Sequence, residues 1–146
     1  MDINSTLNDV LVKLFRNINT IEEQAMRTDE YKDVTTNDMH VIEAIGTGEQ
    51  KNMTTVAKAL HVTTGTLTIS INSLVKKGYV SRVRSEEDRR VVLISLTPRG
   101  REAFLHHRRF HEQMIESVVE DLSEEEKQVL EKALRRLNNF FLSKIN

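Results

Sequence analysis

The feature that most constrains the fold is the stretch Met53–Thr97. Two short helical patterns, Thr54–Leu60 and Thr64–Lys77, are separated by a three-residue break. Two alternating runs follow around a charged tip, Tyr79–Arg84 and Val91–Thr97. Helix, tight turn and helix is the layout of a helix-turn-helix, and a hairpin directly after it makes the motif winged. The stretch therefore predicts a winged helix-turn-helix, a class of fold that binds DNA.

Composition supports a mainly α-helical chain with a small β-hairpin wing. Among 146 residues there are five glycines, one proline and no cysteine. So few helix breakers favour helices, and without cysteine there is no disulfide and no thiol-liganded zinc. No apolar run approaches the roughly 20 residues of a membrane span. The N-terminus lacks the basic and apolar regions of a signal peptide, so we expect a cytoplasmic protein with no membrane partner.

We expect one domain over residues 1–146, organised in two parts. Residues 34–98 form the winged helix-turn-helix, and residues 1–33 together with 99–146 form a helical dimerisation part. In the first part, residues 36–45 are predicted to be helical, and residues 47–52 a polar connection. Residues 28–34 are polar and are predicted to be a loop.

The second helix of the motif has an unusual outer face. Leu67, Ile71 and Leu74 are spaced to point inward, which leaves short polar side chains outside and no charge before Lys76. An ordinary exposed helix would carry Glu and Lys there, whereas short hydroxyls and an amide can approach base edges in the major groove. The alternative is an exposed face without function. The candidate DNA-binding residues on this helix are Thr63, Thr64, Gly65, Thr66, Thr68, Ile69, Asn72 and Lys76.

The tip of the hairpin mixes acids and arginines. An Arg on a narrow projecting loop can enter the minor groove, where the negative potential is strong. Asp88 lies two residues before Arg90 and can hold that guanidinium by a bidentate pair. The alternative is a surface hairpin with weak local ion pairs. The candidate DNA-binding residues of the wing are Arg84, Asp88, Arg89 and Arg90.

Charge is distributed unevenly along the chain. Between Lys76 and Arg109 there are ten basic and four acidic residues, a net charge of +6, and the remainder carries −7. A basic surface beside an acidic body suits a polyanion such as double-stranded DNA. On charge alone, a solvated surface with surplus arginine fits equally well.

The two ends of the chain carry apolar stripes at helical spacing. Residues 6–27 are predicted to form one helix, capped by Ser5 or Thr6, and a capping box of Ser123 and Glu126 begins the last helix. A domain of this size does not need both stripes for one core. We therefore expect a homodimer. Its predicted contact residues are Leu7, Leu11, Leu14, Leu130, Leu134, Leu137, Phe140 and Phe141.

The segment SEEDRRVVLISLTPRG resembles the wing of the multiple-antibiotic-resistance regulator (MarR) family. That family has Asp-x-Arg at the wing tip, alternating apolar residues and then Leu-Thr-x-x-Gly. The resemblance implies a homodimeric repressor that binds pseudo-palindromic operators. The family's motif positions are filled here by Asp88, Arg90, Leu96, Thr97 and Gly100. Carried over to this sequence, the family's pattern implies that Thr64, Thr66, Thr68 and Asn72 face the major groove and that Arg90 faces the minor groove.

Two further segments, DMHVIEAIG and HHRRFHEQM, are similar to the subgroup that represses fatty-acid synthesis in Gram-positive bacteria. In that subgroup, acyl chains carried on acyl carrier protein act as co-repressor. The resemblance therefore implies a second partner, an acidic acyl carrier protein, for the basic face from Arg99 to Arg109. Relatives with similar helices respond to small-molecule effectors instead.

Zinc is the alternative effector. His107 and His111 are four residues apart on one predicted helix, a spacing that can ligate one ion. Zinc-responsive members of the family use ligands from the same helices. The candidate ligands are Glu22, Glu23, His40, His107 and His111, although hydrogen-bonded structural histidines explain the pattern as well.

Other classes of function fit poorly. The sequence has no Cys nucleophile, no glycine-rich phosphate loop and no convincing Ser/His/Asp set, so we do not expect an enzyme or a resident cofactor. A purely structural helical dimer would explain the terminal helices but not the arginine-tipped wing.

Overall fold

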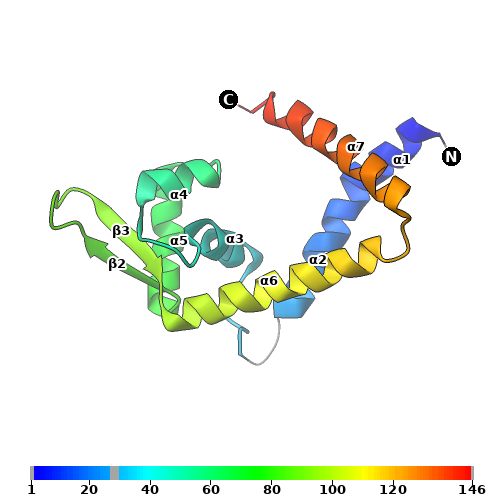
Figure 1. Ribbon diagram of the computed structural model, residues 1–146. Coiled ribbons are helices and arrows are strands. Elements are labelled where there is room, and N and C mark those ends of the chain that lie inside the picture. The colour runs from blue at the N-terminus through cyan, green and yellow to red at the C-terminus, as the bar shows by residue number, and fades with distance from the viewer. Residues whose placement is uncertain (1, 27–29, 146) are drawn as a thin grey trace. The chain divides into compact units, whose positions relative to one another are not determined.

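The computed structural model describes residues 2–26 and 30–145 (Figure 1). It is mainly helical with one small antiparallel sheet, as predicted. The chain divides into two compact units, residues 1–108 and 109–146. Among the described residues, no helix combines the length and the hydropathy that a membrane span requires.

The N-terminal helical segment consists of α1 (Ile3–Asp9), a π-helical stretch η1 (Val10–Leu14) and α2 (Phe15–Met26). The predicted start at residue 6 is wrong. Asp2 is the N-cap, and its carboxylate accepts a hydrogen bond from the Ser5 backbone N–H at 2.8 Å. The predicted last residue, 27, lies outside the described residues.

Helix α3 (Thr36–Ile45) begins with a capping box. The Thr35 hydroxyl accepts from the Asp38 N–H at 3.0 Å, and Asp38 accepts from the Thr35 N–H at 3.1 Å. Lys77 pairs with Asp38 at 2.7 Å and so ties the end of the helix-turn-helix to α3. The preceding segment, residues 28–34, was predicted to be a polar loop. Tyr31 and Val34 in it are buried instead. Residues 28 and 29 lie outside the described residues.

The helix-turn-helix consists of α4 (Met53–Ala59) and α5 (Thr64–Lys77). Asn52 caps the first helix, and Thr63 caps the second. The turn between them places His61 in the left-handed region, with φ of 56°. Gly78 ends α5 with φ of 89°, a conformation that glycine adopts without steric cost.

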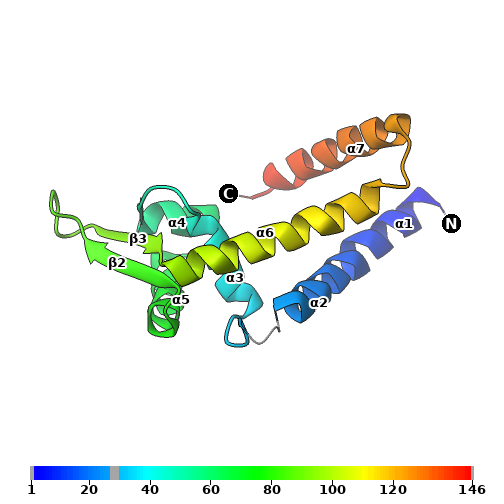
Figure 2. The ribbon, with the colours of Figure 1, turned by 60° about the horizontal axis from the view of Figure 1, so that its bottom comes forward.

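The wing belongs to a three-stranded sheet with strand order β1-β3-β2. The hairpin strands are β2 (Val80–Arg84) and β3 (Val92–Leu96), with Val80 opposite Leu96. Their loop projects beyond the helices of the motif (Figure 2). The third strand, β1 (Lys51–Asn52), pairs with β3 and lies in the segment predicted as a polar connection. A strand of only two residues is too short to show an alternating pattern in the sequence. It forms because it pairs with β3.

The hydrophobic core lies in the first unit, where α3, α4, α5 and the sheet meet. Buried residues of α2 and α6 also belong to this core. The core therefore includes residues that come before and after the segment 34–98 in the sequence. These members are Met26, Tyr31, Val34, Met39, Val41, Ile42, Ile45, Val56, Ala57, Leu67, Ile71, Leu74, Tyr79, Val80, Ile94, Leu96 and Ala103.

Helix α6 (Pro98–Val119) is joined to the wing through Tyr79. The Tyr79 hydroxyl donates to Asp33 at 2.8 Å and accepts from the Arg99 guanidinium at 2.9 Å. Burial raises the pKa of Tyr79, so the phenol remains a donor. Gly100 lies so close that a Cβ there would meet the Tyr79 carbonyl oxygen at 2.1 Å. These contacts join the start of α6 to the base of the wing.

The second unit contains the end of α6 and α7 (Glu124–Leu142). Ser123 and Glu126 form the predicted capping box. No residue of α7 is buried, nor is any residue of α1 or η1. The large exposed apolar side chains of these elements include Leu7, Leu14, Val129, Leu130, Leu134, Phe140, Phe141 and Leu142.

Candidate nucleic-acid interface

Helix α5 presents a narrow outward face. Its buried side chains, Leu67, Ile71 and Leu74, lie on one side, as the spacing predicted. A helix has 3.6 residues per turn, so the positions opposite them form a single stripe. The exposed residues of this stripe are Gly65, Ile69, Asn72 and Lys76. Ile69 is 73% exposed, which makes it an apolar group available to touch a thymine methyl.

The threonines flank this stripe. Thr68 faces the wing, and its hydroxyl donates to the Thr64 carbonyl at 2.8 Å. On the other flank, Asn37 of α3 donates to the Ser70 hydroxyl at 3.1 Å. The side chains nearest the centre of the outer face are therefore the amide and the isoleucine, with hydroxyls at its edges.

The N-terminus of α5 is capped by the Thr63 side chain. The Thr63 hydroxyl accepts from the Thr66 N–H at 3.1 Å and donates to the Thr66 hydroxyl at 3.0 Å. Thr63 therefore has a structural role beside its predicted contact with DNA. At Gly65 a Cβ would meet Thr63 Oγ1 at 3.9 Å and nothing nearer. The backbone here is open to a phosphate approaching the positive end of the helix.

The wing tip contains the ion pair that its spacing predicted. The Arg90 guanidinium donates from Nε to Asp88 Oδ1 and from Nη2 to Asp88 Oδ2, each at 3.1 Å. Hydrogen bonds from the Arg90 side chain, and then its backbone, hold the pKa of Asp88 below its ordinary value. The Arg90 side chain is 91% exposed. It is therefore oriented by its partner and still accessible.

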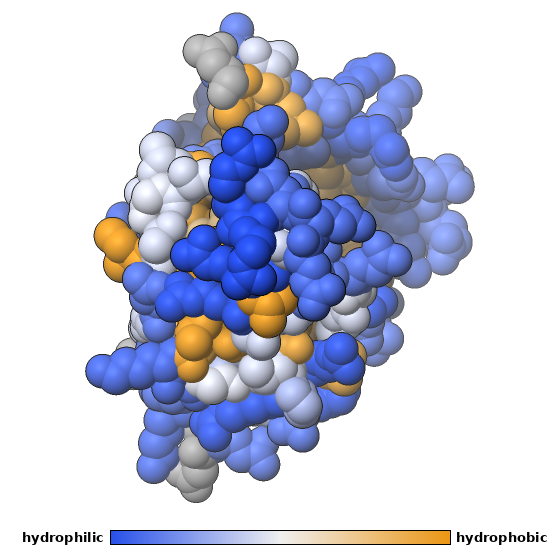
Figure 3. All heavy atoms as spheres, turned by 90° about the vertical axis from the view of Figure 1, so that its left-hand side faces the viewer, coloured by the Kyte–Doolittle hydropathy of each residue, from blue (hydrophilic) through white to orange (hydrophobic). Residues whose placement is uncertain are grey.

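The rest of the loop is held by local hydrogen bonds. Ser85 N–H donates to the Val91 carbonyl, and Val91 N–H donates to the Asp88 carbonyl, both at 2.9 Å. The Arg84 guanidinium donates to the Arg89 carbonyl at 3.1 Å. Figure 3 faces the side on which this loop projects and shows strongly hydrophilic side chains at its centre.

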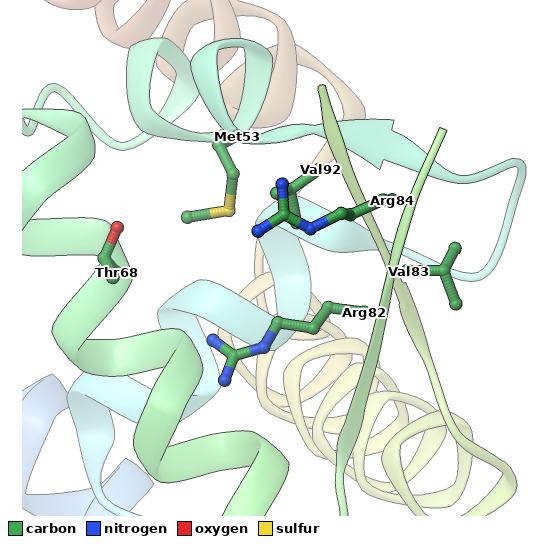
Figure 4. A pocket seen from close by; sticks show the side chains of 6 residues that line it. All are labelled: Met53, Thr68, Arg82, Val83, Arg84 and Val92. Carbon is green, nitrogen blue, oxygen red and sulfur yellow. The ribbon is translucent and has the colours of Figure 1, made fainter. Parts of the chain in front are cut away.

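A groove of about 450 Å³ separates α5 from the wing (Figure 4). Met53 and Val92 supply apolar lining, and Thr68 lies on the α5 side. Side chains alternate along β2, so Arg82 and Arg84 point into the groove while Val83 points away. Its position and its two guanidinium groups suit a sugar-phosphate strand.

Of the six residues that line this groove, Thr68 and Arg84 were predicted to bind DNA, and Met53, Arg82, Val83 and Val92 were not. Arg82 lies two residues before Arg84. Side chains alternate along a strand, so this spacing alone would have placed both arginines on the same face of the sheet. Its guanidinium also donates to Asn72 Oδ1 on α5. Met53 gave no signal, because its position depends on how α4 packs beside the sheet.

The candidate zinc ligands are only partly brought together. Within the first unit, donor atoms of the buried residues Glu22 and His107 lie within 4.8 Å. His107 Nε2 is 2.8 Å from Glu43 Oε1, a partner that the sequence did not indicate. His40 is exposed on α3, and Glu23 accepts a hydrogen bond from Thr36 at 3.4 Å. His111, in the second unit, stacks edge-on against Phe110.

The fold and this face define a winged helix-turn-helix transcriptional regulator of the MarR type. A family model described as transcriptional regulator SarA/Rot matches residues 25–107, and the chain belongs to that family. It is 34% identical to the HTH-type transcriptional regulator SarZ of Staphylococcus haemolyticus over 110 residues, 74% of each protein. Its relatives are regulators rather than enzymes, which confirms the prediction of a non-enzyme.

Solved structures agree with this assignment. Streptococcus pneumoniae FabT in complex with DNA is 41% identical, with a TM-score of 0.91, covering 96% of this chain and 98% of that one. A MarR family transcription regulator has the same fold at 20% identity, with a TM-score of 0.81 over 96% and 92% of the two chains.

Proposed function

We propose that the chain is a homodimeric repressor that binds a pseudo-palindromic operator. In each half-site α5 lies in the major groove and Arg90 enters the minor groove. The oriented and exposed Arg90 beside α5 is the observation that carries this proposal. The similarity to FabT, whose structure was determined with DNA, supports it.

The Arg90→Ala variant tests the proposal. Loss of roughly 1–3 kcal/mol of groove contact should weaken DNA binding by about tenfold or more. The probe is a duplex selected by the wild-type protein from a random pool, and affinity is measured by gel shift at several salt concentrations. Binding of the wild type should fall steeply as salt rises.

The matched control is Arg135→Ala, which removes another exposed arginine paired with a neighbouring carboxylate, Glu131. It should bind DNA like the wild type. The proposal fails if Arg90→Ala keeps its affinity while circular dichroism shows an intact fold. A flat salt response would instead favour a structural helical dimer.

The effector we propose is acyl carrier protein bearing a long acyl chain, acting as co-repressor. The residues that resemble the fatty-acid-synthesis subgroup support this choice. Arg101 is exposed on α6 and offers charge to an acidic partner. Arg99 is less available, because it bonds to the Tyr79 hydroxyl and to the Glu30 carbonyl.

Titration of the DNA complex separates the possible effectors. Palmitoyl-acyl carrier protein should tighten binding severalfold, whereas carrier protein without an acyl chain should not. The second candidate is a zinc-responsive regulator, favoured by the proximity of Glu22 and His107. In that case zinc itself should change DNA affinity, and His107→Ala should abolish the response. No response to palmitoyl-acyl carrier protein would overturn the lipid proposal.

A further inference from the structure

Arg82 connects the wing to the outer face of α5. Its guanidinium Nη1 donates to Asn72 Oδ1. Both residues are exposed, and Figure 4 shows the Arg82 side chain reaching from β2 toward α5. Asn72 belongs to the outward stripe of α5, so the contact lies where α5 would meet base edges.

This contact orients the amide that DNA would meet. A guanidinium has donors and no acceptor, so the Asn72 atom that faces it must be the carbonyl oxygen. That oxygen has two lone pairs, so Arg82 occupies one and leaves the second available, together with the N–H donors of the amide nitrogen. Asparagine pairs with adenine in a bidentate manner, with its oxygen accepting from N6 and its nitrogen donating to N7. Arg82 therefore fixes the direction from which the oxygen and the nitrogen of Asn72 can meet a base.

We infer that Arg82 is a positioning residue that sets the base preference of Asn72. Held in this way, Asn72 presents its amide in one orientation and favours the base edge that matches this orientation. Without Arg82 the amide rotates freely, so the base preference at that position changes. The inference rests on the proposed function, since it needs α5 in the major groove.

The contact can persist in a DNA complex. An arginine has several N–H donors, so Arg82 can bond to Asn72 and to a phosphate in the groove at once. Excluding water from the interface strengthens a charge-assisted hydrogen bond.

Arg84 provides a matched control on the same strand. It points into the same groove, and its guanidinium donates to the Arg89 carbonyl rather than to α5. Loss of a phosphate contact weakens binding to all sequences alike, whereas loss of a base contact changes the preference at one position.

The experiment is selection from a random duplex pool, sequenced for the wild type and for Arg82→Ala, Arg84→Ala and Asn72→Ala. Circular dichroism confirms that each variant folds. Asn72→Ala should relax the base preference at one position per half-site, by about tenfold. Arg82→Ala should change the base preferred at that same position. Arg84→Ala should reduce affinity and leave the preference unchanged.

Two results overturn the inference: Arg82→Ala weakens all sequences alike, or Asn72→Ala changes no position. A wild type that selects no sequence from the pool instead contradicts the proposed function. Titration of isolated selected duplexes, with guanine, thymine or adenine at the position, checks the preference independently.

Discussion

At the scale of single residues, we expect alanine at Gly100 to destabilise the fold and alanine at Gly65 to leave it stable. A Cβ at Gly100 would overlap the Tyr79 carbonyl, which is backbone and cannot give way easily. We expect Gly100→Ala to lower the free energy of unfolding by about 3 kcal/mol, because α6 and the wing must separate. Urea denaturation followed by circular dichroism measures this change.

Gly65→Ala is the counterpart. A Cβ there meets only Thr63 Oγ1, at an ordinary 3.9 Å, so the fold should be as stable or up to about 1 kcal/mol more stable. The new methyl would stand between the α5 backbone and a phosphate, so DNA affinity should fall severalfold in gel shifts. A destabilised Gly65→Ala protein, or one with unchanged affinity, would contradict this assignment.

At the scale of elements, the wing loop depends on the pair of Asp88 and Arg90. Asp88→Asn keeps the shape of the side chain but removes its charge. An exposed pair of this kind is worth up to about 1 kcal/mol, so DNA affinity should fall roughly twofold to fivefold, less than for Arg90→Ala. Gel shifts on one selected duplex compare the two variants. An equal or larger loss in Asp88→Asn would mean that Asp88 does more than orient its partner.

The lowered pKa of Asp88 gives this pair a definite pH range. A carboxyl whose pKa is depressed in the folded protein keeps its interaction above the ordinary value of 3.8 and loses it only as pH falls through the lowered value. DNA affinity between about pH 5 and pH 8 should therefore show no step that Asp88→Asn removes. A step that disappears in this variant would contradict the assignment.

At the scale of the whole molecule, α7 provides a test of the proposed dimer. Leu134 is 53% exposed in a helix with no buried residue, which is costly unless a second subunit covers it. We expect Leu134→Glu to be monomeric in analytical ultracentrifugation. Its affinity for a duplex with two half-sites should fall at least about tenfold, because each α5 then binds alone.

Gln128→Glu is the control, since it adds the same negative charge to the polar side of α7. It should remain dimeric and bind DNA like the wild type. A monomeric wild type would refute the dimer, and a Leu134→Glu variant that stays dimeric would remove Leu134 from its interface.

Much of this protein was predictable from residues near one another in the sequence. The inward positions of α5 follow from helical spacing. The capping box at Ser123 and the pair of Asp88 and Arg90 each join residues two or three positions apart. Such contacts depend on local backbone geometry, so their residue types and spacing were enough to find them.

Contacts between distant segments were decided by the tertiary structure. Strand β1 exists because β3 pairs with it, and Tyr31 is buried in the core with its ring against His106 of α6. Glu43 meets His107 across two helices, and Arg82 meets Asn72 only when the wing folds beside α5. The sequence by itself determined which side chains α5 and the wing loop expose, because local spacing sets their faces. Only the packing of the wing against α5 decided that Arg82 orients the amide of Asn72.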